Sequence, residues 1–391
     1  MIQGKDETFM QSYLKFFNNY FQYNNGKKVP ILFVDGPTDK DFYYKVFEDT
    51  ELKIPKINIQ HNFAPKDYGK DAKHDKSGNE SWIEGWGNPF KDEATELVKR
   101  GTSEEGFRRN FDFVIAATYY AKPTLYDNLY GNIDCFGFVD KDFGKFDVDG
   151  KTLLSYGLDG SNRNISITEF HDRETTVFYN FFPLWYQENN AVVQDDFVET
   201  LRKILIFAAK QGVMEQQSIV SGNCKILKAI SNFNFDYLKG KGGKMKKELW
   251  TKIKNICCLN KGYLTDFDFE KYIDWCKETE ANNLGQWFGV YQDNLEYFFN
   301  TCNDEFSKIN ITNKMLLDWL EGGKENEELK SVFNLANGHM LLNIYGAVFG
   351  NGEHSLGKGE SKMSETLLSI AQKNDISKIP SVKRYELYRN R

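Results

Sequence analysis

Apolar positions are arranged differently in the two halves of the chain, and the change falls near residue 185. In the first half, short apolar runs typical of buried strands alternate with segments whose apolar residues recur at helical spacing. This alternation predicts a mainly parallel sheet flanked by helices. Strands are predicted at 29–34, 54–59, 111–117, 135–139 and 165–168, and helices at 7–24, 39–48, 92–100 and 175–182.

The pattern predicts two domains. Residues 1–185 form the predicted α/β domain, which opens with a helix and carries a polar insertion at about 61–90. Residues 186–391 form the second predicted domain, which is mainly α-helical because helical spacing dominates there. Its predicted helices are 195–211, 268–278, 284–300, 315–320, 340–349 and 364–373.

Acidic residues follow two of the predicted strands. Asp35 follows the run 29–34, and Asp140 and Asp142 follow the run 135–139. Open α/β sheets bind ligands at the carboxyl ends of their strands. Side chains two apart on an extended segment point the same way, so Asp140 and Asp142 can converge on one cation. Because Mg²⁺ prefers carboxylate oxygens, the three residues predict a Mg²⁺ (or Mn²⁺) site.

The alternative reading of these acids is structural. Aspartate after a strand is common in turns, where its side chain bonds the local backbone. Asp39 is predicted to be the N-cap of the next helix, with Thr38 as the other candidate for that position.

Two further polar motifs precede predicted helices. His171, Asp172 and Glu174 lie between the strand 165–168 and an aromatic helix, and Asn337-Gly338-His339 opens a helix in the second half. Acidic residues in a first helical turn also complement the helix dipole, and histidines often serve as structural hydrogen-bonding groups. Both readings stay open for these residues.

The order of these motifs resembles a known family. The D-G-x-x-D segment 35–39, the V-D-x-D-F segment 139–143 and the T-x-x-H-D-x-E segment 168–174 resemble the TOPRIM (topoisomerase–primase) domain. More narrowly, they resemble a TOPRIM-like bacterial anti-phage defence family that includes the nuclease effector subunit of PARIS-type systems. The segment 337–339 is similar to the distal element of that family.

The resemblance implies a TOPRIM-like sheet and a metal-dependent nuclease that cuts RNA or DNA. Asp35, Asp140 and Asp142 would be metal ligands and, with Glu174, catalytic residues. The supporting residues would be Asp39, His171, Asp172 and His339. An ABC-type ATPase partner and a homodimer are further implied expectations.

One departure from the family pattern keeps a second reading open. Asp35 stands where the family has glutamate, and loss of one methylene shortens the reach of the carboxylate. The alternative is therefore a catalytically inactive TOPRIM-fold sensor or partner-binding protein. A primase-like nucleotidyl transferase is a third reading, but it requires nucleotide-binding elements that the sequence does not display.

Charge and composition narrow the picture. The formal net charge of −6 argues against a generally basic surface that coats nucleic acid. A local lysine-rich segment remains a candidate for phosphate contact, with a solvated charged face as the alternative. Its candidate nucleic-acid-binding residues are Lys241, Lys244, Lys246 and Lys247. The segment 352–359 nearly matches a P-loop, but Gly359 replaces the required Ser or Thr, so a Gly-rich loop is the better interpretation.

The cellular location of the protein is predicted from sequence patterns that we do not find. The six cysteines form no C-x-x-C pair, which favours reduced thiols over a disulfide or zinc framework. We see no signal-peptide pattern and no apolar run near the roughly 20 residues that a membrane helix needs. We therefore expect a cytoplasmic protein with no membrane association.

Overall fold

The computed structural model describes residues 30–48, 54, 56–61, 114, 118, 135–141, 164–189, 194–220, 256–260, 263–268, 270–272, 274, 297–298, 300–323, 326–349, 354–357, 359–374 and 376–389. The chain divides into two compact units. The first draws on residues up to 140, on 146–168 and on 380–391, and the second comprises 141–145 and 169–379. The predicted helices 7–24 and 92–100 lie outside the described residues, as does the predicted insertion beyond residue 61.

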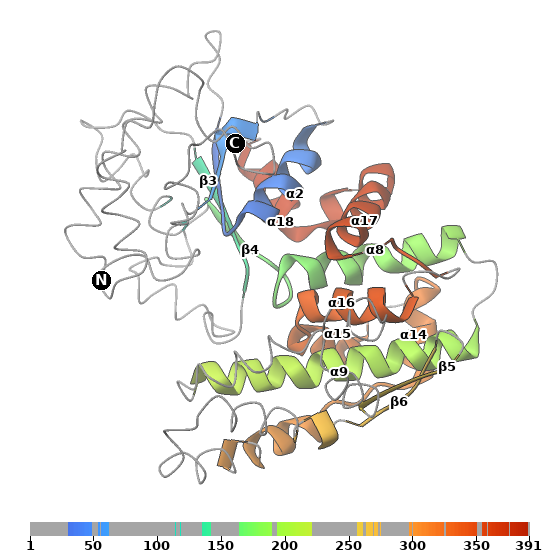
Figure 1. Ribbon diagram of the computed structural model, residues 1–391. Coiled ribbons are helices and arrows are strands. Elements are labelled where there is room, and N and C mark those ends of the chain that lie inside the picture. Colours follow the sequence, from blue (N-terminus) through green and yellow to red (C-terminus); the bar gives the residue numbers. More distant parts are fainter. Residues whose placement is uncertain are drawn as a thin grey trace, which may run out of the picture. The chain divides into compact units, whose positions relative to one another are not determined.

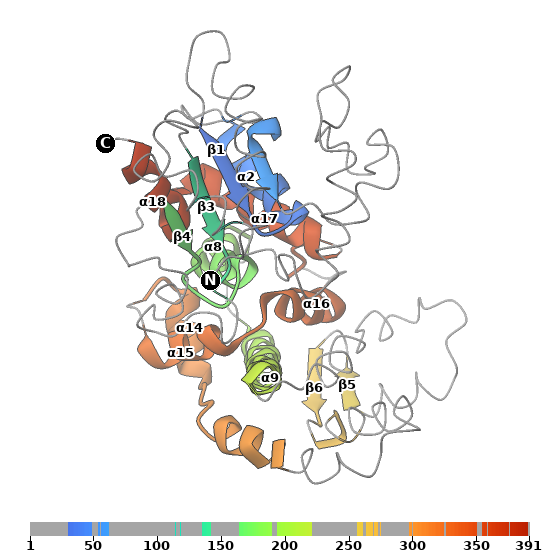
Figure 2. The same ribbon diagram turned by 90° about the vertical axis from the view of Figure 1, so that its left-hand side faces the viewer.

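The first unit is built on a four-stranded parallel sheet, which confirms the predicted sheet type. Its strands are β1 (Ile31–Val34), β2 (Ile59–His61), β3 (Cys135–Val139) and β4 (Ile165–Ile167), in the spatial order β2-β1-β3-β4. Figure 2 shows β1, β3 and β4 side by side. Every residue of β1 and β3 is buried, as expected for parallel strands covered on both faces.

Aromatic side chains attach two helices to one face of this sheet. The helices are α2 (Pro37–Glu48) and α18 (Pro380–Arg389), shown in Figure 1. The ring of Tyr43 stacks on Phe138 at 4.0 Å, and Tyr385 meets Phe136 edge-on at 5.1 Å. The hydroxyls of Tyr43 and Ser381 are hydrogen-bonded at 3.2 Å. Helix α18 is therefore packed on the sheet of the first unit, although it lies far from the strands in the sequence.

Two predicted strands differ in the structure. Apolar and β-branched residues predict an extended segment at 111–117, but Val114 and Thr118 are helical and the Thr118 hydroxyl donates to the Val114 carbonyl. A Cβ on Gly137 would lie 2.8 Å from Val114, so the glycine admits this turn. Within 54–59, a 3₁₀ turn (Lys56–Asn58) precedes β2, so the strand begins only at Ile59.

The second unit is organised around α8 (Arg173–Asn189), which packs against several other helices. Helix α8 contacts α14, α16 and α17, and α9 contacts α14, α15 and α16 (Figure 1). The bounds are α9 Asp195–Val220, α14 Asn313–Leu320, α15 Glu327–Leu335, α16 Gly338–Phe349, α17 Glu360–Asn374 and the 3₁₀ helix η4 Ile376–Lys378. None of the described helices has the length and apolar character that a membrane crossing requires.

The second unit differs from the predicted helical domain in where it begins and ends in the sequence, and it contains a β-hairpin. The expected boundary near 185 falls inside α8, which belongs wholly to the second unit. A short antiparallel hairpin, β5 (Cys257–Asn260) with β6 (Tyr263–Phe267), packs against α9 and adds two strands to a domain predicted to be mainly α-helical. The predicted helices 195–211, 315–320, 340–349 and 364–373 are confirmed, with α9 extending to Val220.

Many of the aromatic residues of the sequence pack together in the core of the second unit. Phe178 stacks on Phe182 at 4.3 Å along α8. Phe182 also meets Tyr345 edge-on at 5.4 Å and stacks on Trp319 at 5.8 Å. Aromatic pairs at these spacings contribute beyond the area they bury, so α8 is fixed against α14 and α16 by ring contacts.

A proline in α8 removes one helical hydrogen bond, and α14 supplies a replacement donor. Pro183 has no N–H, so it cannot make the helical hydrogen bond to the carbonyl of Tyr179. The indole Nε1–H of Trp319 donates to that carbonyl at 3.1 Å. A buried backbone acceptor is thereby satisfied from a neighbouring helix.

We predict that Trp319→Phe will destabilise the second unit by about 1–3 kcal/mol, because it leaves a buried carbonyl without its donor. In a Pro183→Ala background the alanine N–H can restore the helical bond, so the same change should cost about 1 kcal/mol less. Thermal and urea unfolding of the four proteins in this double-mutant cycle measure the difference. An equal cost in both backgrounds would contradict the proposed compensation.

Candidate functional site

Two of the predicted acids meet at one edge of the sheet in the first unit. Asp35 directly follows β1 and Asp140 directly follows β3, and these strands are parallel neighbours. The backbone N–H of Asp140 donates to Oδ2 of Asp35 at 2.9 Å. Because β1 is followed by β2 on one side and β3 by β4 on the other, the point between them is the topological switch point. The predicted position of both residues at one strand edge is therefore observed.

The predicted cap of α2 is different in the structure. The helix begins at Pro37, so Gly36 is the capping residue and Asp39 lies in the first turn. Asp39 is buried, and one carboxylate oxygen lies 3.4 Å from where a Cβ on Gly36 would stand. Proline favours the first helical position because its missing N–H is not needed there. Asp142 and the four candidate lysines lie outside the described residues.

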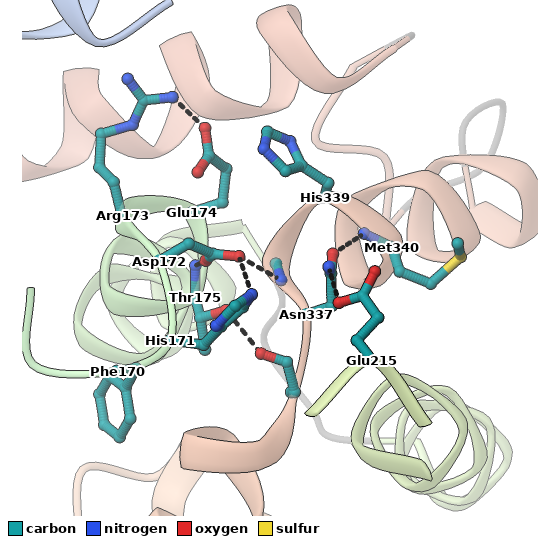
Figure 3. Close-up of polar contacts among 12 residues, drawn as sticks. Phe170, His171, Asp172, Arg173, Glu174, Thr175, Glu215, Asn337, His339 and Met340 are labelled. Atoms are coloured by element: carbon teal, nitrogen blue, oxygen red, sulfur yellow. Dashed lines mark hydrogen bonds and ion pairs between the residues drawn. The ribbon is translucent and has the colours of Figure 1, made fainter. Parts of the chain in front are cut away.

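A second polar group lies in the second unit, where Asp172 joins two helix N-termini (Figure 3). Its Oδ1 accepts from the backbone N–H of Thr175 at 2.7 Å, which caps α8. Its Oδ2 accepts from the backbone N–H of Gly338 at 2.7 Å, at the start of α16. The hydroxyl of Thr175 donates to the carbonyl of Ala336 at 3.2 Å and reinforces the same junction. The motifs 168–174 and 337–339 are therefore joined in space.

Gly338 is required by the closeness of this junction. A Cβ at this position would collide with a carboxylate oxygen of Asp172 and would lie 2.6 Å from the Thr175 nitrogen and 2.7 Å from the Glu174 Cβ. Two of these neighbours are backbone or backbone-proximal atoms, which cannot move aside alone. The glycine of the Asn-Gly-His motif therefore has a packing function.

Asn337 connects the junction to α9. Its side-chain oxygen accepts from the Met340 N–H at 2.9 Å and caps α16, while its amide nitrogen donates to Glu215 Oε2 at 2.7 Å. Burial raises the pKa of Glu215 to about 7, with a further increase from the charge of Asp172 and opposition from the Asn337 hydrogen bond and His339. Glu215 is thus a titratable group within the physiological range.

The pKa of Asp172 is shifted the other way. Burial acts to raise it, but the neighbouring His171 and His339 and the hydrogen bonds from Thr175 together lower it. His171 is buried, and its Nε2 lies 3.9 Å from Oδ2 of Asp172. In this position the predicted supporting residue His171 stabilises the ionised form of the capping carboxylate.

Glu174, His339 and Glu360 converge above the junction. Their ligand atoms all lie within 4.8 Å of one another, a spacing at which they could hold a metal ion. His339 Nδ1 and Glu360 Oε1 are 2.5 Å apart, and this hydrogen bond is the main reason that the pKa of His339 is raised to about 10. Glu174 is buried and ion-paired with Arg173, and Figure 3 shows its carboxylate and the His339 ring facing a common space.

Two acidic residues that contact the predicted motifs, Glu215 and Glu360, are not predicted from the sequence as site residues. Glu215 lies within the long helix α9, and Glu360 is the first residue of α17, directly after the Gly-rich loop. No local pattern distinguishes Glu215 from a solvated helix position. Glu360 carries a weak signal, since acidic residues are common in a first helical turn.

Comparison with known proteins gave no match. No protein-family model matches the sequence, and neither the curated proteins nor the solved structures searched contain a match.

We predict that Gly338→Ala will destabilise the protein by about 1–3 kcal/mol or more, because overpacking at this junction has no flexible neighbour to absorb it. Gly346→Ala, on the same helix, is the matched control. There an added Cβ meets the flexible end of Met363 at 2.9 Å, and alanine favours the helix by up to about 1 kcal/mol. Thermal unfolding measures both, and similar losses for the two variants would contradict the assignment.

A second prediction concerns pH. The pKa of Glu215 is raised in the folded protein, so its ionisation opposes folding: the cost is absent below its ordinary value of 4.5, grows toward pH 7 and then levels. Glu215→Gln keeps an acceptor for Asn337 and removes the charge. The thermal midpoints of variant and wild type should match near pH 4 and diverge by pH 7.5 in favour of the variant. A constant difference across this range would contradict the shifted pKa.

Proposed function

We propose that this chain is a divalent-metal-dependent nuclease of TOPRIM-like type that cuts phosphodiester bonds in RNA or DNA, as the effector of a bacterial anti-phage system. The observation that carries the proposal is the meeting of Asp35 and Asp140 at the switch point of a parallel sheet. This is where α/β sheets of this kind bind ligands. The resemblance supplies the chemistry expected of acids at that position.

The donors at this edge fit a hard cation. Asp35 and Asp140 offer carboxylate oxygens from adjacent strand ends, and Mg²⁺ is commonly held by one or two carboxylates and several waters. Asp142 belongs to the same proposed ligand set by the resemblance. A cation held there would supply charge stabilisation at the phosphate and a more acidic bound water.

The residues of the chain contribute position and charge. Asp35 fixes the backbone of Asp140 by its hydrogen bond and brings a second negative charge to the same edge. The N-terminus of α2 follows immediately, and backbone N–H groups at helix starts favour phosphate oxygens. The lysines at 241, 244, 246 and 247 are proposed to contact the nucleic-acid backbone.

Partners remain part of the proposal. The resemblance supports an ABC-type ATPase that holds the nuclease in check, and a homodimer as its assembled form. A cytoplasmic location follows from the same reading, since the ATPase and the nucleic-acid substrate are found there.

One observation favours the alternative, a TOPRIM-like sensor or partner-binding protein without catalysis. An oxygen of Asp35 is committed to the Asp140 backbone, a bond for which the short aspartate side chain has the right reach. In this reading the carboxylate joins two strand ends and Asp35 is structural. The two readings differ in whether the charge of Asp35, as distinct from its hydrogen bond, matters.

The Asp35→Asn variant distinguishes the nuclease reading from the sensor reading. The asparagine side chain can still accept the hydrogen bond from the Asp140 N–H, but it carries no charge. The nuclease reading predicts that cleavage of labelled RNA and DNA with Mg²⁺ or Mn²⁺ falls by about 10²-fold or more, at an unchanged thermal midpoint. Asp140→Ala should be similarly inactive, and Asp304→Ala, an exposed acid far along the chain, should retain full activity. Equal cleavage by the wild type, Asp35→Asn and Asp140→Ala would rule out the nuclease reading.

A further inference from the structure

We propose that Glu174, His339 and Glu360 form a divalent-cation site in the second unit, which takes Mn²⁺ or Zn²⁺ in preference to Mg²⁺. The residues come from three helices, α8, α16 and α17, and from positions far apart in the sequence. The resemblance also implies a catalytic role for Glu174 and a supporting role for His339, but the binding of an ion by these three side chains can be measured without nuclease activity.

The spacing of the three donors suits one ion. Donor atoms bound to a metal at about 2.1 Å lie roughly 3–4 Å from each other, whether the geometry is tetrahedral or octahedral. The three ligand atoms lie within 4.8 Å of one another, so small side-chain movements bring all of them into range. No change of the backbone is required.

The backbone of this site is already fixed. Asp172 accepts hydrogen bonds from the backbone N–H groups of Thr175 in α8 and Gly338 in α16. Glu174 and His339 are the sequence neighbours of these two donors, so their backbone positions are held by the same carboxylate. Helix α17 packs against both α8 and α16 and brings its first residue, Glu360, to the same place. A site that is assembled before the ion arrives loses little entropy on binding.

The two carboxylates of the site are balanced by positive charge, which a bound cation could supply in part. Glu174 is only 3% exposed, and a carboxylate so deeply buried is stable only with compensating positive charge. Arg173 provides part of this charge through its ion pair. Glu360 adds a second carboxylate, which the protonated His339 balances in the metal-free protein. A bound cation would take the place of that proton, because histidine binds a metal as the neutral imidazole.

The donor types decide which cation is favoured. Two carboxylates and one imidazole form a mixed oxygen and nitrogen set, whereas Mg²⁺ prefers oxygen donors and keeps its waters. Imidazole nitrogen suits Zn²⁺ and other first-row transition metals, and carboxylates are accepted by Mn²⁺. The His339 side chain is 53% exposed, which gives an ion access from solvent and leaves positions for water.

The test uses the full-length protein stripped with chelator and titrated with MnCl₂, ZnCl₂ and MgCl₂ by calorimetry. The wild type should bind Mn²⁺ and Zn²⁺ more tightly than Mg²⁺ at this site. His339→Ala and Glu360→Gln should each weaken that binding by at least about 10-fold. These positions are chosen because they are not buried, so the variants should fold. Glu328→Gln, an exposed acid on α15, is the matched control and should bind as the wild type does.

A spectroscopic measurement identifies the ligand directly. Pulsed EPR of the Mn²⁺-loaded protein should show coupling to an imidazole ¹⁴N that disappears in His339→Ala and persists in Asp140→Ala. The last variant also separates this proposal from the nuclease, since Asp140 is a ligand in the proposed nuclease and is not one of the three ligands proposed here. Absence of ¹⁴N coupling in the wild type, or unchanged Mn²⁺ affinity in His339→Ala, would overturn the proposal whatever the nuclease assay shows.

Discussion

The double cap made by Asp172 is the interaction on which the second unit depends. Each helix start leaves backbone N–H groups without partners and carries partial positive charge. The Asp172 carboxylate accepts from one backbone N–H at the start of α8 and from one at the start of α16. Its pKa is lowered by the neighbouring His171 and His339 and by the hydrogen bonds from Thr175. Because Glu174 and His339 lie beside these two caps in sequence, the same bonds that join the helices also set the distance between their side chains.

Because α8 and α16 are joined at this point, each residue of the Asn-Gly-His motif has a different role in the structure. Asn337 caps α16 and contacts Glu215, and Gly338 permits the close approach of α8. His339 has neither function, since its side chain is largely exposed and its hydrogen bond is to Glu360. Two residues of the motif thus serve the fold and hold the third, which faces solvent, in a fixed place.

The features that could be predicted from the sequence are those that depend on short-range pattern. Apolar runs located β1, β3 and β4, and the parallel order implied by alternation brought Asp35 and Asp140 together. Long-range packing was not predictable in this way. Val114, in the segment expected to be a strand, is helical and lies close to Gly137, and Glu360 joins Glu174 only through the packing of α17 on α8. In both cases the deciding contact lies far away in the sequence.

The return of α18 to the first sheet has a consequence for synthesis. Tyr43 and Ser381, which are hydrogen-bonded in the finished unit, are separated by 338 positions. At about 5–20 residues per second, translation of the intervening second unit occupies roughly 10–40 s. During that time Phe136 and Phe138 lack the cover that Tyr385 later provides. The first unit, although begun first, is completed last, and its aromatic sheet face is the surface that a chaperone would meet on the ribosome.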